Sequence, residues 1–190
     1  SPEFRFNGTV FHYDYSGLQL SQVSNACGGP CQITTNAAKA KIDGVELDAT
    51  IQPVDNFSVR LALNYLDARY GQFNPQPTID FAGRALNRSP KWSWVAGVNY
   101  AIPVGEGKVV LDAQTASRSQ YELTDLANFA YFAQPGFSKT DASITYNAPE
   151  DRFYIAAFVE NIEDNLVLTG AGTGLFGNAT FSDPRTYGVR

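Results

Sequence analysis

Hydrophobic and polar residues alternate with a period of two along most of this 190-residue chain. In residues 57–65, every second residue is hydrophobic, and the residues between them are polar or small. Successive side chains of a β-strand point to opposite faces, so this pattern predicts a strand with one apolar and one polar face. Similar alternation predicts strands at 45–51, 92–102, 109–114 and 141–146, looser ones at 6–15 and 153–159, and a final strand that starts at 186 and stops at 190. We therefore expect an all-β, antiparallel fold.

The composition excludes several classes of protein. The chain has 14 Lys and Arg residues against 19 Asp and Glu residues, a formal net charge of −5, which is too acidic for a surface that binds nucleic acid. Its longest apolar runs fall far short of the roughly 20 residues that a membrane-spanning helix needs. The chain shows no signal peptide, and residues 1–4 resemble a cloning scar, so we expect residues 5–190 to form one β-domain.

The connections between the predicted strands alternate in length. Turn-forming residues make short connections at 53–56, 104–107 and 147–151, whereas long polar connections lie at 20–34, 72–88, 122–134 and 165–183. Outer-membrane barrels have short turns at one end and long loops at the other, an arrangement that a soluble sandwich does not need. Residues 92–102 could also cross the hydrocarbon as a tilted strand, with aromatic residues near both ends. We therefore predict transmembrane strands of an up-and-down barrel, with their apolar faces toward lipid.

The two cysteines lie close together, in the sequence Cys27-Gly28-Gly29-Pro30-Cys31 of the first long connection. In an oxidising compartment, a local disulfide across the Gly-Gly-Pro segment is the interpretation that fits best. A metal site would need further ligands, and no histidine or third cysteine is near in the sequence. A redox pair usually has two intervening residues rather than three. These two alternatives stay open behind the disulfide.

Three motifs that could carry chemistry have simpler explanations. Residues 172–177 match the G-x-G-x-x-G spacing, but no helix is predicted after them, so we expect a loop instead of a dinucleotide site. His12 is the only histidine, it lies within a strand pattern, and the chain has no G-x-S-x-G motif. Glu160, Glu163 and Asp164 lack the spacing of a calcium-binding loop, and a solvated rim explains them. We therefore predict no catalytic, cofactor-binding or metal-binding residues.

The polar faces of the predicted strands would line the interior of a barrel. They carry Glu46, Asp48, Arg60, Asn64, Asp112, Gln114, Arg118, Gln120 and Asp141. Such residues can simply hydrate a pore or pair with a plug that fills it. Residues near the long connections could instead bind a solute, and the candidates are Arg84, Arg88, Arg118, Gln120 and Tyr121.

Four segments, taken in order, resemble motifs of one protein family. Residues 36–47 are similar to a late barrel strand in which Asn, small residues and Gly-x-Glu recur, and residues 87–92 to an N-x-S-P-x-W strand start. Residues 159–164 look like an N-L-x-D strand ending, with Ile162 in place of Leu, and residues 184–190 resemble the start of the last strand. The ordered set resembles the barrels of TonB-dependent receptors.

This resemblance implies the C-terminal portion of a 22-stranded outer-membrane barrel, with about eight strands and an incomplete last one. It also implies a receptor, not an enzyme, for a scarce solute of the siderophore-iron, cobalamin or carbohydrate class in the outer membrane of a Gram-negative bacterium. The plug domain and TonB box are expected to be absent from this chain, so TonB, ExbB and ExbD would act through a missing N-terminal part. Two alternatives stay open: a self-contained eight-stranded barrel with a structural or adhesive role, and a soluble enzyme or binding fragment.

Overall fold

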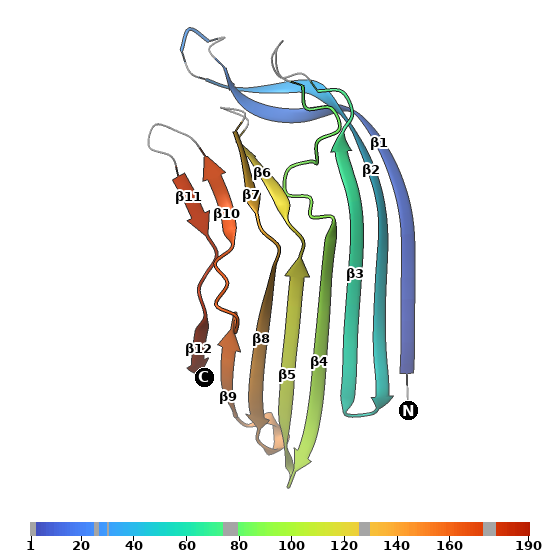
Figure 1. Cartoon of the computed structure of the whole chain (residues 1–190). Coiled ribbons are helices and arrows are strands. Elements are labelled where there is room, and N and C mark those ends of the chain that lie inside the picture. Colours follow the sequence, from blue (N-terminus) through green and yellow to red (C-terminus); the bar gives the residue numbers. More distant parts are fainter. Residues whose placement is uncertain (1–2, 25–26, 30, 74–79, 126–129, 173–177) are drawn as a thin grey trace.

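A computed structural model describes residues 3–24, 27–29, 31–73, 80–125, 130–172 and 178–190 (Figure 1). The main sheet consists of β1 (Glu3–Ser24), β2 (Cys31–Val54), β3 (Phe57–Tyr70), β4 (Trp92–Val104), β5 (Gly107–Arg118), β8 (Phe137–Asn147), β9 (Tyr154–Glu160) and β12 (Thr186–Val189). Two short hairpins accompany it, formed by β6 (Tyr121–Asp125) with β7 (Ala130–Gln134) and by β10 (Leu168–Gly172) with β11 (Asn178–Phe181). A single 3-10 turn, η1 (Pro149–Asp151), completes the elements of the described residues.

The eight main strands form one antiparallel sheet in the order β1-β2-β3-β4-β5-β8-β9-β12, which we call the wall. Each strand pairs with the main strand that follows it in the chain, as in an up-and-down barrel. The predicted all-β, antiparallel fold of about eight strands is therefore confirmed, including the short last strand β12. Within the described part of the chain, no helix has both the length and the apolar character needed to cross a membrane.

Short and long connections lie at opposite ends of the wall (Figure 1). The turns β2–β3 and β4–β5 and the η1 connection lie at one end, which we call the turn end. The connections β1–β2, β3–β4, β5–β8 and β9–β12 lie at the other, the loop end. This arrangement is the one that the alternating connection lengths predict.

Three of the four long connections contain more regular structure than predicted. The expected loop at 20–34 is wrong, because β1 and β2 continue through most of it as a two-stranded ribbon. The connections at 122–134 and 165–183 each contain one of the short hairpins. The hairpin strands have only four or five residues, which is too short to establish a period of two, and register shifts between Tyr15 and Gln19 interrupt the alternation in the ribbon.

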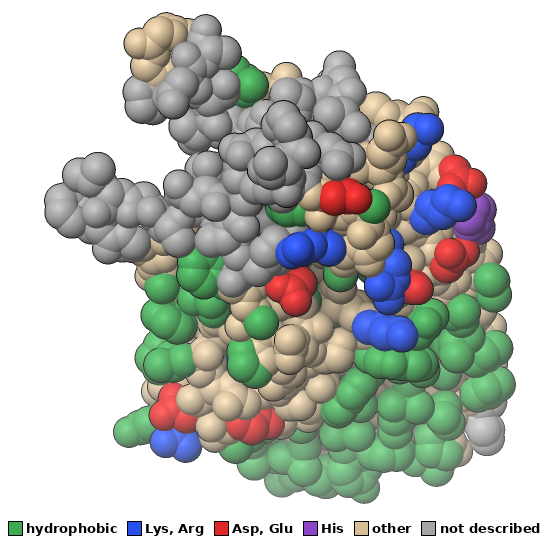
Figure 2. All heavy atoms as spheres, turned by 45° about the horizontal axis from the view of Figure 1, so that its top comes forward, with side chains coloured by type: hydrophobic (Ala, Val, Ile, Leu, Met, Phe, Trp, Pro, Cys, Tyr) green, Lys and Arg blue, Asp and Glu red, His purple; other side chains and the backbone are tan. Residues whose placement is uncertain are grey.

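One face of the wall carries a continuous apolar band, and we call it the outer face. Leu47, Leu63 and Trp94 are consecutive register partners on β2, β3 and β4. Leu63 and Trp94 remain 38% and 39% exposed, as expected for side chains that contact lipid rather than pack in a protein core. Figure 2 shows hydrophobic side chains gathered in the lower part of the view, with most of the charged ones above them.

Aromatic pairs mark both edges of this band. Toward the loop end, the ring centroids of Tyr65 and Trp92 lie 4.7 Å apart, and we call this pair the upper girdle. Toward the turn end, Phe57 and Tyr100 lie 5.9 Å apart. Phe57 and Tyr65 are eight residues apart on β3, which corresponds to about 26 Å along a strand. Because transmembrane strands tilt by about 35–45°, this length covers roughly 20 Å along the membrane normal, most of the apolar band of about 25 Å in such barrels.

The buried core of the chain lies at the loop end rather than in the wall. Tyr70 at the end of β3 packs with Phe73 and Phe81 of the β3–β4 connection, and all three side chains are at most 3% exposed. Leu123 of β6 and Val167, just before β10, are also buried. The long connections therefore form a packed structure over the end of the wall.

Candidate functional site

The inner face, opposite the apolar band, carries a row of side chains that runs across four strands. It consists of Glu46 on β2, Asn64 on β3, Ser93 on β4 and Arg118 on β5, which are consecutive register partners. Neighbouring strands lie about 4.8 Å apart, so this inner row is roughly 14 Å long. It lies at the level of the upper girdle, on the opposite face of the sheet.

The inner row borders a hollow of about 350 Å³, and one buried polar atom beside it lacks a partner. The Oδ1 atom of Asn64 is buried and accepts no hydrogen bond from the described residues. By contrast, Asp48 on the adjacent row accepts a 3.0 Å hydrogen bond from Asn7 Nδ2. A bound water or a ligand donor can satisfy a buried acceptor such as Asn64 Oδ1. The inner row is therefore the part of the polar face that is best suited to bind something else.

Beyond the inner row, toward the loop end, the inner face of β1 carries three successive aromatic side chains. Phe11, Tyr13 and Tyr15 occupy alternate positions, and the neighbouring ring centroids are 5.4 and 5.9 Å apart. The Phe11 ring covers Gly44, where an added Cβ atom would lie only 2.2 Å from it. Tyr13 and Tyr15 remain 49% and 47% exposed. These three residues form what we call the aromatic stripe.

At the same level, the outer face becomes charged. His12 Nδ1 lies 2.7 Å from Asp43 Oδ1, and His12 Nε2 lies 3.0 Å from Asp14 Oδ2. On β3, Arg69 Nε donates to Asp67 Oδ1 at 2.6 Å. Hydrogen bonds with Asp43 and Asp14 raise the pKa of His12, outside the apolar band, above its ordinary value of 6.5. On β1, β2 and β3, the outer face therefore changes from apolar to charged at the upper girdle, and the inner face changes from polar to aromatic or apolar.

Two of the residues predicted to bind a solute lie in the β3–β4 connection. The Arg84 guanidinium lies 5.3 Å from the centroid of the Phe81 ring, and the side chain is exposed. Arg88 donates from Nη2 to the Thr169 carbonyl at 2.6 Å and from its backbone N–H to the Glu122 carbonyl at 2.9 Å. Arg88 thereby connects its own segment to both short hairpins, which is a structural role.

The other three predicted residues lie between the end of β5 and the start of β6. Arg118 belongs to the inner row, and Gln120 is exposed. Tyr121 is only 9% exposed, because it is part of the core at the loop end, and this burial leaves little of its ring for a solute. Binding of a solute by these residues, and by Arg84 and Arg88, stays a prediction.

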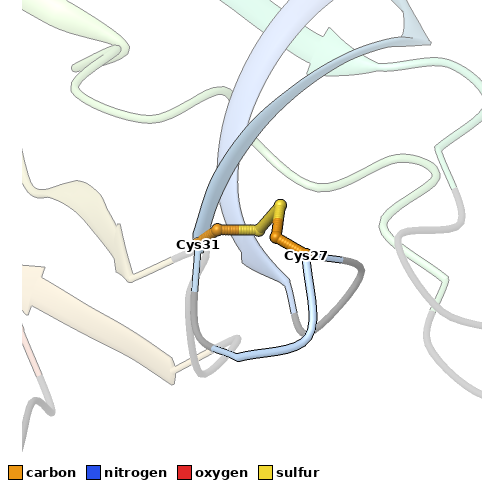
Figure 3. The surroundings of a disulfide bond; sticks show 2 residues. All are labelled: Cys27 and Cys31. Atoms are coloured by element: carbon orange, nitrogen blue, oxygen red, sulfur yellow. A yellow bond between two sulfur atoms is a disulfide. The ribbon is translucent and has the colours of Figure 1, made fainter.

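Cys27 and Cys31 form a disulfide at the tip of the β1–β2 ribbon (Figure 3). Their Cα atoms lie 6.1 Å apart, within the usual range for a disulfide. The predicted local disulfide is therefore confirmed, although Pro30 lies outside the described residues. The bond closes the end of a ribbon that extends beyond the wall.

The acidic segment after β9 forms a structural turn. Asn161 and Asp164 both have φ values of 56°, which reverse the chain direction. Asp164 Oδ1 accepts from the backbone N–H of Arg185 at 2.8 Å. Glu163 accepts from the hydroxyl and, at 2.7 Å, the backbone N–H of Thr140, and these bonds lower its pKa below the ordinary 4.5. The described residues contain no group of three or more His, Cys, Asp or Glu side chains suited to hold a metal.

The structure describes only the first residue of the G-x-G-x-x-G spacing at 172–177. Gly172 ends β10, but residues 173–177 of the G-x-G-x-x-G spacing lie outside the described residues. The aromatic stripe does not follow from the alternation of residues 6–15, which fits a single apolar face only loosely. One signal in the sequence does mark it. The apolar residues are even-numbered up to Val10, and the aromatic residues from Phe11 to Tyr15 are odd-numbered.

Comparison with known proteins gave one family. A family model described as TonB dependent receptor-like, beta-barrel matches residues 2–162. No curated protein sequence matches the chain.

Several solved structures are similar in fold. The ferric yersiniabactin uptake receptor FyuA from Yersinia pestis is 19% identical with a TM-score of 0.78, over 98% of this chain and 27% of FyuA. The copper transporter OprC is 18% identical with a TM-score of 0.70, over 98% of this chain and 28% of OprC. The siderophore receptor PiuA from Acinetobacter baumannii is 17% identical with a TM-score of 0.69, over 98% of this chain and 25% of PiuA. The chain therefore spans about a quarter of the length of these structures.

Proposed function

This chain belongs to the TonB-dependent receptors, and we propose that it is the C-terminal part of the barrel of an outer-membrane receptor that imports a scarce solute. Residues 5–190 would form this barrel segment, and the plug would belong to the rest of the full-length protein. Family and fold are those of receptors and transporters rather than enzymes.

The two-faced wall is the observation that carries this proposal. Its outer face has an apolar band with aromatic edges, which suits the hydrocarbon of the outer membrane. Its inner face carries polar and charged side chains, among them Asn64 with its buried, unpartnered Oδ1, at the level where a solute would enter from the loop end. A wall with these two faces can separate lipid from a polar interior, which is what a transport barrel must do.

We propose a metal chelate as the imported solute, ahead of the cobalamin and carbohydrate classes. The support comes from similar structures, which include an uptake receptor for ferric yersiniabactin, a siderophore receptor and a copper transporter. Energy would come from TonB, ExbB and ExbD, acting through the N-terminal part of the full-length protein.

Uptake of radioactive iron by the Gram-negative source strain tests this function. Cells with and without the full-length gene would receive iron-55 as a panel of hydroxamate, catecholate and citrate complexes, with copper and cobalamin as further substrates. We expect uptake of at least one metal complex to need both the gene and TonB. Uptake of the whole panel that is unchanged by deletion of the gene would contradict the proposal.

A further inference from the structure

We propose that the aromatic stripe and the inner row form one binding site for a weakly charged solute that carries aromatic rings and hydrogen-bond donors. This inference rests on the proposed function, because it names the chemistry of the solute that the receptor would bind. It follows from three observations: an exposed aromatic surface on the inner face, a buried acceptor without a partner near it, and the balance of charges around the hollow.

The aromatic stripe is placed to stack on a ring rather than to fill a core. The core at the loop end shows how this chain covers its own aromatic residues, because Phe73 and Phe81 leave Tyr70 only 3% exposed. Tyr13 and Tyr15 lie on the same face and are about half exposed. Their rings present flat faces together with hydroxyl groups, a combination suited to ligands that are aromatic and polar.

Gly44 gives the stripe its flat base. The Phe11 ring lies so close to the β2 backbone that any side chain at position 44 would displace it. Gly44 pairs with Phe11 on one side and with Leu66 on the other, so the surface continues as an apolar floor onto β3. A ligand ring that stacks on this surface would therefore meet apolar groups beneath it.

The inner row supplies polar groups within reach of the same ligand. Asn64 lies one strand beyond Gly44 and two residues closer to the turn end, so it is about 12 Å from the Phe11 position by strand spacing. Its buried Oδ1 has no hydrogen-bond donor among the described residues, and the exposed Glu46 carboxylate beside it is a second acceptor that a ligand could reach. The hollow of about 350 Å³ has the size of a small-molecule pocket.

Charge balance decides against a strongly anionic solute. Among the charged side chains that line the hollow, Glu46 and Asp48 are negative and Arg118 is positive. A polyanion drawn to Arg118 would be repelled by Glu46, whereas a neutral solute with N–H or O–H groups would match both the carboxylate and the Asn64 oxygen.

Two ferric complexes isolate the aromatic contribution. Ferric tris(benzohydroxamate) and ferric tris(acetohydroxamate) are both neutral, share the same chelating group with its N–H donors, and differ in having phenyl or methyl substituents. Equilibrium binding of the iron-55 complexes to the full-length receptor would give both dissociation constants. We expect the phenyl complex to bind more tightly to the unmodified receptor.

Variants of the stripe and the row should separate the two contributions. The double substitution Tyr13→Leu and Tyr15→Leu should weaken the phenyl complex by about threefold to tenfold and leave the methyl complex unchanged. Asn64→Leu should weaken both complexes by a similar factor, because it removes the acceptor for the shared N–H donors. The double substitution Tyr13→Phe and Tyr15→Phe keeps the rings and should keep the preference. His12→Ala, on the same strand but the outer face, should change neither constant.

Two results would overturn the inference. One is equal binding of the two complexes by the unmodified receptor, which would also be seen if another part of the full-length protein covered the stripe. The other is an equal loss of both complexes in the double Leu variant. In either case, uptake of other metal complexes that still depends on the gene would leave the proposed function intact, so the two failures are distinguishable.

Discussion

The wall and the loop end protect their hydrophobic side chains in different ways. On the outer face of the wall, Leu61 and Trp94 remain 43% and 39% exposed. At the loop end, Tyr70 and Phe81 are 3% and 1% exposed within a core made by the chain itself. The wall therefore depends on hydrocarbon to cover it, whereas the loop end is built like a small protein in water.

The two regions share strands, and the change occurs within a few residues. On β3, Leu63 and Tyr65 point outward, and Leu66, Ala68 and Tyr70 beyond them point inward. Because alternate residues reach opposite faces, one strand can serve lipid in one half and a protein core in the other without any change in its backbone. Substitutions in the wall should therefore change stability through contact with lipid, and substitutions at the loop end should change it through packing.

The largest effect should come from the core at the loop end. Phe81→Ala would leave a cavity against Tyr70 and Phe73 and should cost about 3–5 kcal/mol of local stability. Hydrogen exchange at the Tyr70 N–H, which donates to the Arg84 carbonyl at 2.9 Å, would report the loss. The matched control is Phe181→Ala, which alters a side chain that is 58% exposed. Equal exchange in the two variants would mean that the core does not hold this end together.

A charge on the outer face should have the next largest effect. Leu61→Arg places a cation within the apolar band and should cost roughly 2–4 kcal/mol of barrel stability. Urea unfolding of the full-length receptor in lipid vesicles would measure it. Ala62 is the next residue along β3 and lies on the inner face of the wall, so Ala62→Arg places the same charge in the polar interior and should cost much less. A similar cost for both variants would show that the outer face does not meet lipid.

A smaller effect is expected where the two regions meet. Gly44→Ala would push the Phe11 ring away from the β2 backbone and should cost about 1–3 kcal/mol, as overpacking does. Gly97→Ala is the control, because the nearest atom to its added Cβ is 3.7 Å away, an ordinary contact. Unfolding in the same vesicles would compare the two. The prediction fails if both substitutions are tolerated equally.

The smallest effect should be a pH dependence at the rim. Because Thr140 lowers the pKa of Glu163, this carboxylate stabilises the fold above pH 4.5, and the contribution is lost as the pH falls through its lowered pKa. Glu163→Gln should therefore be less stable than the unmodified receptor at neutral pH, and the difference should shrink in acid. His12 should behave oppositely, since its raised pKa gives a contribution present below pH 6.5 that is lost at higher pH. A difference for Glu163→Gln that does not vary with pH would contradict this account.

The sequence could predict those parts of the fold that face two different solvents. Alternation located the main strands because lipid on one side and polar groups on the other impose a period of two. It could not locate the β6–β7 and β10–β11 hairpins, whose strands of four or five residues are too short to establish a period of two. In the upper β1–β2 ribbon, register shifts between Tyr15 and Gln19 interrupt the alternation. The burial of Tyr121 also escaped it, because that core is made by contacts between connections far apart in the chain.

The candidate site was predictable only in part, for a related reason. Arg118 and the other polar positions of the wall follow from the alternation. The aromatic stripe requires knowing that the apolar side of β1 changes beyond Val10, and a single sequence does not mark where a membrane ends. The pairing of His12 with Asp14 and Asp43 gives that boundary only once the strands are in register.

The exchange of faces at the upper girdle restricts how the length of these strands can vary among related proteins. An insertion of one residue in β2 between Gly44 and Val45 would turn every side chain beyond it to the other face, so the stripe would lose its base and charges would enter the barrel. An insertion of two residues would keep both faces and move the boundary by about 7 Å. Length changes in this part of the wall should therefore occur in even numbers.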